Sequence, residues 1–177
     1  MGSMTTTQFT ATASPAPRWA VRAAHAAALV SLPCGIWRLL LAAGQHAGYT
    51  DEGYLAAQGS MGPGWGAVYL IALSAVSELA ALLTLGLVRP WGEVLPRWIP
   101  VLGGRPVPVR AAVVPATVGA VVLACLWTPF LLWWTFPHAD MTPLGHTLLG
   151  FVYLPQVAWA PLLAAVTVSY HRRRRAV

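Results

Sequence analysis

The stretch WGAVYLIALSAVSELAALLTLGLV, residues 65–88, decides the fold. It is almost entirely apolar, and it is longer than the ~20 residues that an α-helix needs to cross the hydrocarbon core of a bilayer. Its one charged residue, Glu78, lies near the middle. Because a carboxylate at that depth costs roughly 2.5 kcal/mol or more, Glu78 requires a partner, a proton or a function.

The rest of the chain has the same apolar character. Of its 177 residues, 57% are hydrophobic and only 9% are charged, which is not the composition of a soluble domain. Because backbone groups in lipid must be paired within helices, we predict an all-α fold, an integral membrane antiparallel four-helix transmembrane bundle. The predicted spans lie near 20–44, 65–88, 111–135 and 146–169.

The arginines predict the orientation of this bundle. All eleven Lys and Arg residues are arginines, and apart from Arg38 they lie near the start of the first span, between the second and third spans, and after the fourth. The positive-inside rule then places both termini in the cytoplasm of a multi-pass protein of the plasma membrane. We therefore attribute the net charge of +6 to topology and expect no nucleic acid partner.

One membrane domain is expected, over residues 20–171. Residues 1–19 lack apolar periodicity and begin with MGSM, which looks like the remnant of an expression tag, so they are expected to form a disordered tail. Residues 172–177 are expected to form a basic cytoplasmic tail. The connector 89–110 is rich in proline and should be extended and stiff, because proline fixes φ and lacks an N–H. Residues 51–60 are expected to form a short surface helix.

Polar residues recur inside the predicted spans. Ser74, Ser77 and Glu78 stand at i, i+3 and i+4, a spacing that places them on one helix face. If such residues faced lipid, their hydrogen-bonding groups would stay unsatisfied, so we predict that they face one another in a polar seam inside the bundle. The seam also contains Arg38, Tyr153 and Gln156.

Arg38 and Glu78 are the charged members of this seam. At 1.5 Å per residue, Arg38 lies roughly 24 Å beyond Arg22, and Glu78 roughly 16 Å before Arg89. The two side chains nevertheless approach each other, because side chains lean toward the N-terminus of their own helix and the two helices run in opposite directions. They form either a buried ion pair that fixes helix register or the polar end of a ligand cavity. In a third alternative, Arg38 extends to the interface and Glu78 is protonated.

Prolines and tryptophans within the spans bear on the cavity alternative. A proline bends a helix and frees a carbonyl, so a bent bundle can hold a pocket, although proline is also common in ordinary membrane helices. Trp37 and Trp127 lie deep enough to face the seam, where an aromatic face stabilises a cation. The prolines concerned are Pro33, Pro115, Pro129, Pro155 and Pro161.

The external side carries acidic residues and histidines but no arginine. Asp51 and Asp140 are candidate acids at the outer mouth of the bundle. No HxxxH or CxxC spacing supports a metal site, so we expect no metal and no cofactor. Cys34 and Cys125 lie in apolar runs and are expected to be small core residues.

The segment WGEVLPRWIPVLGGRPVPVRAAVVPA, residues 91–116, with the span that follows it, resembles a pattern in small actinobacterial integral membrane proteins of unassigned function. This resemblance implies a four-span fold and no particular activity. On chemistry alone, the intramembrane carboxylic acid and the tryptophan-rich interior are similar to those of the small membrane-bound terpene cyclases. That similarity implies acid-initiated chemistry on an isoprenoid.

The leading functional hypothesis is a membrane-embedded enzyme acting on a hydrophobic, isoprenoid-like molecule that enters from the bilayer. Glu78 would donate or accept a proton and Arg38 would orient it. Substrate would be held by Ser74, Ser77, Tyr153 and Gln156, and cationic intermediates would be shielded by Trp37 and Trp127. The rival classes are a small proton-coupled transporter that works as a homodimer and an accessory membrane subunit without its own site.

Overall fold

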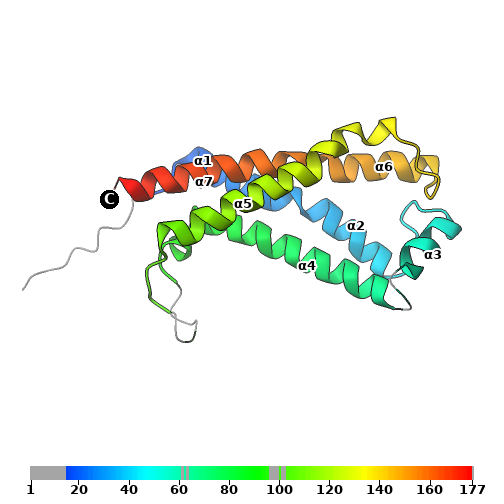
Figure 1. Ribbon diagram of the computed structural model, residues 1–177, viewed down its shortest axis with the longest axis horizontal. Coiled ribbons are helices and arrows are strands. Elements are labelled where there is room, and N and C mark those ends of the chain that lie inside the picture. The colour runs from blue at the N-terminus through cyan, green and yellow to red at the C-terminus, as the bar shows by residue number, and fades with distance from the viewer. Residues whose placement is uncertain (1–14, 61, 63, 96–99, 101–102, 177) are drawn as a thin grey trace, which may run out of the picture.

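The computed structural model describes residues 15–60, 62, 64–95, 100 and 103–176, and within these residues it contains helices and two isolated β-bridges but no strand (Figure 1). Most of the predicted N-terminal tail lies outside the described residues. Four helical segments are long and apolar enough to cross a membrane, which confirms the predicted number of spans and the all-helical class. They are Arg18–Ala42, Trp65–Gly86, Val109–Thr135 and Pro143–Arg175.

Three of these four segments are interrupted, and each interruption has a proline beside it. The break at Ser31 precedes Pro33, and two short 3₁₀ helices each carry a proline, Pro129 or Pro155, in their first turn. Proline removes one backbone donor and crowds the preceding turn, which favours such changes of helix type. The helices are α1 (Arg18–Val30), α2 (Leu32–Ala42), α3 (Asp51–Gly59), α4 (Trp65–Gly86), η1 (Pro90–Gly92), α5 (Val109–Trp127), η2 (Thr128–Thr135), α6 (Pro143–Tyr153), η3 (Leu154–Ala158) and α7 (Trp159–Arg175).

Small residues hold the bundle together. Helix α1 packs against α4 and α7, α2 packs against α4, and α5 packs against α7. Alanine at these contacts lets helix backbones approach closely, which is how helices associate where lipid supplies no hydrophobic driving force. The buried core comprises Ala24, Ala27, Ala81, Leu87, Ala120, Trp159, Leu163, Val166 and Tyr170.

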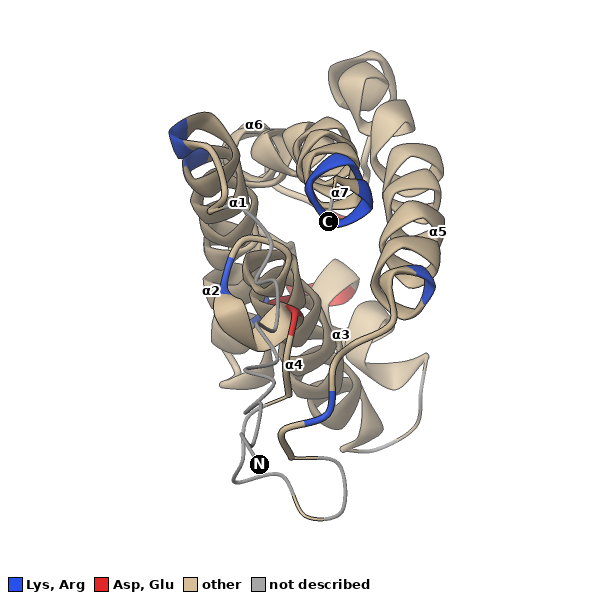
Figure 2. Ribbon diagram, turned by 90° about the vertical axis from the view of Figure 1, so that its left-hand side faces the viewer, with Lys and Arg blue, Asp and Glu red and all other residues tan. Residues whose placement is uncertain are grey.

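The arginine-rich end of the molecule is fastened by α7 (Figure 2). Arg173 pairs with Glu93 at 3.3 Å and donates to the carbonyl oxygen of Leu87 at 2.8 Å. Arg174 donates to the carbonyl oxygen of Val107 at 2.9 Å. These contacts with the α4–α5 connector keep the chain helical through Arg175, so the basic residues up to Arg175 continue α7.

The α4–α5 connector does not run straight. Its two described arms form an isolated bridge between Val94 and Pro106, and the amide of Leu95 donates to the carbonyl oxygen of Arg105 at 3.0 Å. The prediction of an extended segment holds for these arms only locally, because the chain doubles back between them. Residues 96–99 and 101–102 of this connector lie outside the described residues.

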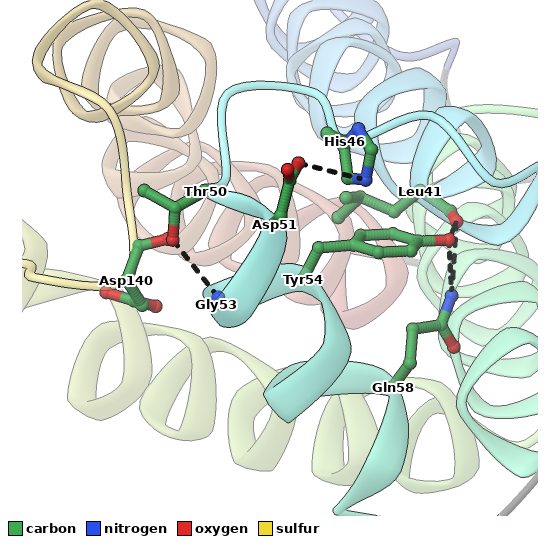
Figure 3. A network of polar contacts seen from close by, with 8 residues as sticks. All are labelled: Leu41, His46, Thr50, Asp51, Gly53, Tyr54, Gln58 and Asp140. Carbon is green, nitrogen blue, oxygen red and sulfur yellow. Dashed lines mark hydrogen bonds and ion pairs between the residues drawn. The ribbon is translucent and has the colours of Figure 1, made fainter.

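At the opposite end, the predicted short helix is present as α3, and side-chain hydrogen bonds secure it (Figure 3). Thr50 caps α3 by accepting from the amide of Gly53 at 3.1 Å, and its hydroxyl donates to the carbonyl oxygen of Asp140 at 3.1 Å. The hydroxyl of Tyr54 and the amide of Gln58 donate to the carbonyl oxygen of Leu41 at 3.2 and 3.4 Å. These contacts satisfy a carbonyl at the end of α2 and hold α3 against that end of the helix.

Candidate functional site

A cavity of about 550 Å³ lies between α4 and α5, in the half of the bundle nearer α3. Its volume is within the range of about 300–1,000 Å³ that is usual for small-molecule sites. Leucines from α2, α4, α5 and α6 form much of its wall. Its aromatic residues are Trp37, Tyr49, Tyr69, Trp127, Phe130, Trp133, Tyr153 and Trp159.

A second cavity, of about 500 Å³, continues along the same two helices toward the arginine-rich end. The two cavities share three wall residues, which are Ala80, Leu123 and Trp159. Because α4 packs on α1 and α2 whereas α5 packs on α7, the space between α4 and α5 is not filled by a direct helix contact along its length. Both cavities therefore lie between two helices that do not pack directly on each other.

Arg38 supplies the charge in the wall of the first cavity, and among the described wall residues it is the one that carries charge. Its side chain is buried, with 5% of its surface exposed. The guanidinium donates to the hydroxyl of Ser77 at 3.3 Å and to the sulfur of Cys34 at 3.5 Å, and it lies 5.7 Å from the ring centre of Tyr153. All of these partners are neutral, so the cavity wall contains a cation without a direct counter-ion.

Glu78 does not pair with Arg38. The described residues form ion pairs between His46 and Asp51 and between Arg173 and Glu93, but none between Arg38 and Glu78, so the predicted ion pair is wrong. The Oε1 atom of Glu78 is buried without a hydrogen-bond partner in the described part of the chain. This oxygen lies in the notch at Gly35, where an added Cβ would be 3.2 Å from it.

Arg38 and Glu78 approach the same turn of α2. Gly35, beside the Glu78 oxygen, directly follows Cys34, whose sulfur accepts from the Arg38 guanidinium. Both side chains approach the same helix face, as their lean predicts. The guanidinium then finds Ser77 and Cys34 as acceptors, and Glu78 is not part of the cavity wall.

Cys34 links Arg38 of α2 to Gln156 of η3 through hydrogen bonds. Its thiol, which is fully buried, accepts from Arg38 and from the side-chain amide of Gln156, and it donates to the carbonyl oxygen of Ser31 at 3.1 Å. Cys34 had been expected to be only a small core residue. Its spacing of four residues before Arg38 is the sequence signal that would have identified it, because i and i+4 side chains meet on a helix.

The predicted substrate-binding residues divide into two groups. Those that line the first cavity are Ser77, Trp37, Trp127 and Tyr153. Ser74 and Gln156 are buried but do not line it. The hydroxyl of Ser74 has no hydrogen-bond partner in the described residues, and Gln156 reaches the site only through Cys34.

Sequence reasoning missed several aromatic wall residues. Trp159 is 3% exposed and belongs to both the bundle core and the cavity wall. The ring of Phe130 lies 5.8 Å from that of Tyr153, and the ring of Trp127 lies 5.7 Å from it. Tyr49 lies in the loop between α2 and α3 and still lines the cavity. Composition placed these rings in or near the spans, but it gave no indication of which face they occupy.

The candidate outer acids lie outside the cavity wall. Asp51 is exposed and pairs with His46 at 3.7 Å, and the side chain of Asp140 is also exposed. Burial raises the pKa of the Tyr49 phenol, and the negative charge of Asp140 acts in the same direction. The phenol at the cavity mouth therefore keeps its proton and remains a hydrogen-bond donor at neutral pH.

The histidines at the outer end stack on an aromatic ring. The ring of His138 lies 3.8 Å and that of His146 5.2 Å from the ring of Trp133. Within the described residues, no three His, Cys, Asp or Glu side chains are grouped so that they could hold a metal ion. The site is therefore described by its aromatic rings, its hydroxyl groups and one arginine.

Comparisons with protein-family models, with curated proteins and with solved structures found no match to this chain. The class of the protein therefore rests on its own fold and site. It is an all-helical protein with four helices of membrane-spanning length and an aromatic cavity between two of them.

Proposed function

We propose that this protein binds a hydrophobic small molecule that enters from the bilayer between α4 and α5. The observation that carries the proposal is the cavity of about 550 Å³, whose wall is aromatic and aliphatic except for Arg38, Ser77 and tyrosine hydroxyls. Pockets of this kind bind ligands by burying apolar surface, while a few polar groups fix orientation. A seam filled by side chains, as expected for an accessory subunit, would have left no such space.

The proposal includes a topology. An antiparallel bundle with both termini in the cytoplasm is supported by the arginines of α1, α5 and α7, which gather at the end that holds the C-terminus (Figure 2). The acidic residues of α3 lie at the opposite end with Asp140. This charge asymmetry is the pattern that the positive-inside rule describes for a multi-pass protein of the plasma membrane.

We further propose that the bound molecule undergoes acid–base chemistry. Glu78 has a buried carboxyl oxygen without a hydrogen-bond partner in the described residues, so no other group of the chain occupies this oxygen. Its neighbour in sequence, Ser77, lines the cavity and accepts a hydrogen bond from Arg38. A proton would pass from the Glu78 carboxyl to the oxygen of Ser77, and the hydroxyl proton of Ser77 to an isoprenoid-like substrate, after a small shift of the Glu78 side chain.

The transporter alternative requires a second copy of the chain. Four spans enclose no continuous pathway on their own, so transport would require a homodimer with Glu78 at its interface. In the protomer, Glu78 is half-buried and faces Gly35 of α2, which favours a role inside one chain. We therefore favour ligand binding within one protomer over transport by a homodimer.

The test uses a substitution that fills the junction of the two cavities. Ala80→Phe places a ring where both cavities share a wall, whereas Ala75→Phe adds the same ring to α4 at an exposed position outside both walls. Lipid extracts of the purified proteins are compared by mass spectrometry. We expect an apolar compound with the wild type and with Ala75→Phe, and at least about tenfold less of it with Ala80→Phe.

Two outcomes would contradict the proposal. One is the absence of any enriched apolar compound in the wild-type extract. The other is equal retention by Ala80→Phe and Ala75→Phe. A Glu78→Gln variant tests the chemistry separately, because it should retain the compound but leave it unconverted.

A further inference from the structure

The polar groups around the cavity are mainly hydrogen-bond donors. The indole N–H groups of Trp37, Trp127 and Trp159 are buried and have no acceptor in the described part of the chain, and all three residues line the cavity. Only 3% of the surface of Trp159 is exposed. A buried donor without an acceptor is destabilising, and an acceptor brought by a ligand would remove this cost once a small rotation of the rings turns the N–H groups to the cavity.

The positive charge of Arg38 in the cavity wall also favours a ligand that supplies a hydrogen-bond acceptor. The guanidinium of Arg38 has five N–H donors, and the partners that the described residues give it, Ser77, Cys34 and Tyr153, are all neutral. A cation in an apolar site is stabilised most by an oxyanion, since charge-assisted hydrogen bonds are about twice as strong as neutral ones. Glu78 does not serve this purpose, because its buried oxygen lies at Gly35 and is not part of the wall.

The number of charges limits the kind of oxyanion. A phosphate monoester carries about −1.5 to −2 at neutral pH, and one guanidinium would leave part of that charge uncompensated in a low-dielectric site. A carboxylate carries a single charge and has the planar geometry that a guanidinium binds with two parallel hydrogen bonds.

We propose that the ligand is a long-chain carboxylate whose head binds Arg38 and the neighbouring indole N–H groups. Its chain runs between α4 and α5 toward the second cavity, which adjoins the first at Ala80 and Leu123. This inference rests on the proposed binding of a hydrophobic molecule and specifies its chemical class.

The test compares three probes that share one chain: oleate, methyl oleate and oleyl alcohol. Native mass spectrometry of the detergent-solubilised full chain measures the dissociation constant of each. We expect wild-type protein to bind oleate at least about tenfold more tightly than methyl oleate, because only oleate offers the oxyanion. Arg38→Gln should bring the two dissociation constants within about threefold of each other.

Because Arg38→Gln can disturb the fold, a second variant leaves the charge in place. Trp37→Phe with Trp127→Phe replaces two indoles by smaller benzene rings, which removes two N–H donors but keeps an aromatic group at each position. It should weaken oleate binding about 3- to 10-fold and change methyl oleate binding by less than about twofold. Trp65→Phe is the matched control, since Trp65 is 65% exposed and lies outside the cavity wall. It should change neither constant.

The outcomes separate this inference from the proposed function. If methyl oleate and oleyl alcohol bind as tightly as oleate, and Ala80→Phe weakens all three, the carboxylate inference is overturned and the hydrophobic site stands. If the double tryptophan variant retains full oleate preference, the donor argument is overturned. If no probe binds the wild type, both proposals fail.

Discussion

Replacing Cys34 with alanine tests the polar cluster at the base of the cavity. In the structure, the buried thiol accepts from Arg38 and Gln156 and donates to Ser31, so it joins α2 to η3. Alanine removes the acceptor, so the N–H groups of Arg38 and Gln156 that bond to the thiol lose that buried partner. We therefore expect this substitution to destabilise the protein more than the loss of one small side chain would.

The magnitude follows from three contributions. Each stranded donor costs about 1 kcal/mol, at the low end of the usual range because sulfur is a weak acceptor and hydrogen bonds in membrane proteins average about 0.6 kcal/mol. The space left by the sulfur costs about 1 kcal/mol more. The expected loss for Cys34→Ala is therefore about 2–3 kcal/mol. Cys34→Ser keeps an acceptor and should lose about 1 kcal/mol.

The chain contains its own control, because Cys125 is the second free cysteine and its side chain is exposed on α5. Cys125→Ala should change the free energy of unfolding by less than about 0.5 kcal/mol. Unfolding in mixed detergent micelles is followed by circular dichroism and tryptophan fluorescence at increasing fractions of dodecyl sulfate. If the two alanine variants unfold at the same detergent fraction, Cys34 has no bonding role and the description of the cluster is refuted.

Three further substitutions test the two ends of the bundle. Arg173→Gln should lower the free energy of unfolding by about 1–2 kcal/mol, because it removes an ion pair and a bond to a carbonyl of the α4–α5 connector; an unchanged detergent midpoint would contradict this. Thr50→Ala removes the cap of α3 and should speed hydrogen exchange in that helix by about fivefold, for a loss of about 1 kcal/mol; uniform exchange across the whole protein would exclude a local effect. Gly145→Ala should destabilise by more than about 2 kcal/mol, because its Cβ would overlap the carbonyl oxygen of Gly48. Gly59→Ala, which meets open space, is its control and should be neutral in the same unfolding assay.

The spans were predictable because they depend on composition over long windows. Apolar runs of membrane length identify helices whatever their neighbours are, and all four appear within a few residues of the predicted limits except at the C-terminus. There the helix continues to Arg175, because Arg173 and Arg174 bond to carbonyls and a carboxylate of the connector. Such contacts join residues about 70 to 90 positions apart, and the local sequence does not encode them.

The site was predicted less completely. Helical periodicity correctly placed Ser77 beside Arg38, because both are polar residues that must avoid lipid. It could not determine which of several acceptors the guanidinium would choose. That choice depends on small differences in side-chain position within one helical turn, and here the guanidinium bonds to Cys34 and Ser77 rather than to Glu78.

The cavity itself depends on where the helices are interrupted. The break at Ser31 and the 3₁₀ helices η2 and η3 belong to three different spans, yet all three adjoin residues of the cavity or of the Cys34 cluster. A 3₁₀ turn rises more steeply than an α-turn and rotates the following side chains, so η2 turns Phe130 and Trp133 toward the cavity and η3 delivers Trp159 at the start of α7. Ordinary irregularity of helix packing would scatter such interruptions along the bundle. Their grouping around one aromatic space is instead the arrangement expected if the helices were shaped to keep that space open.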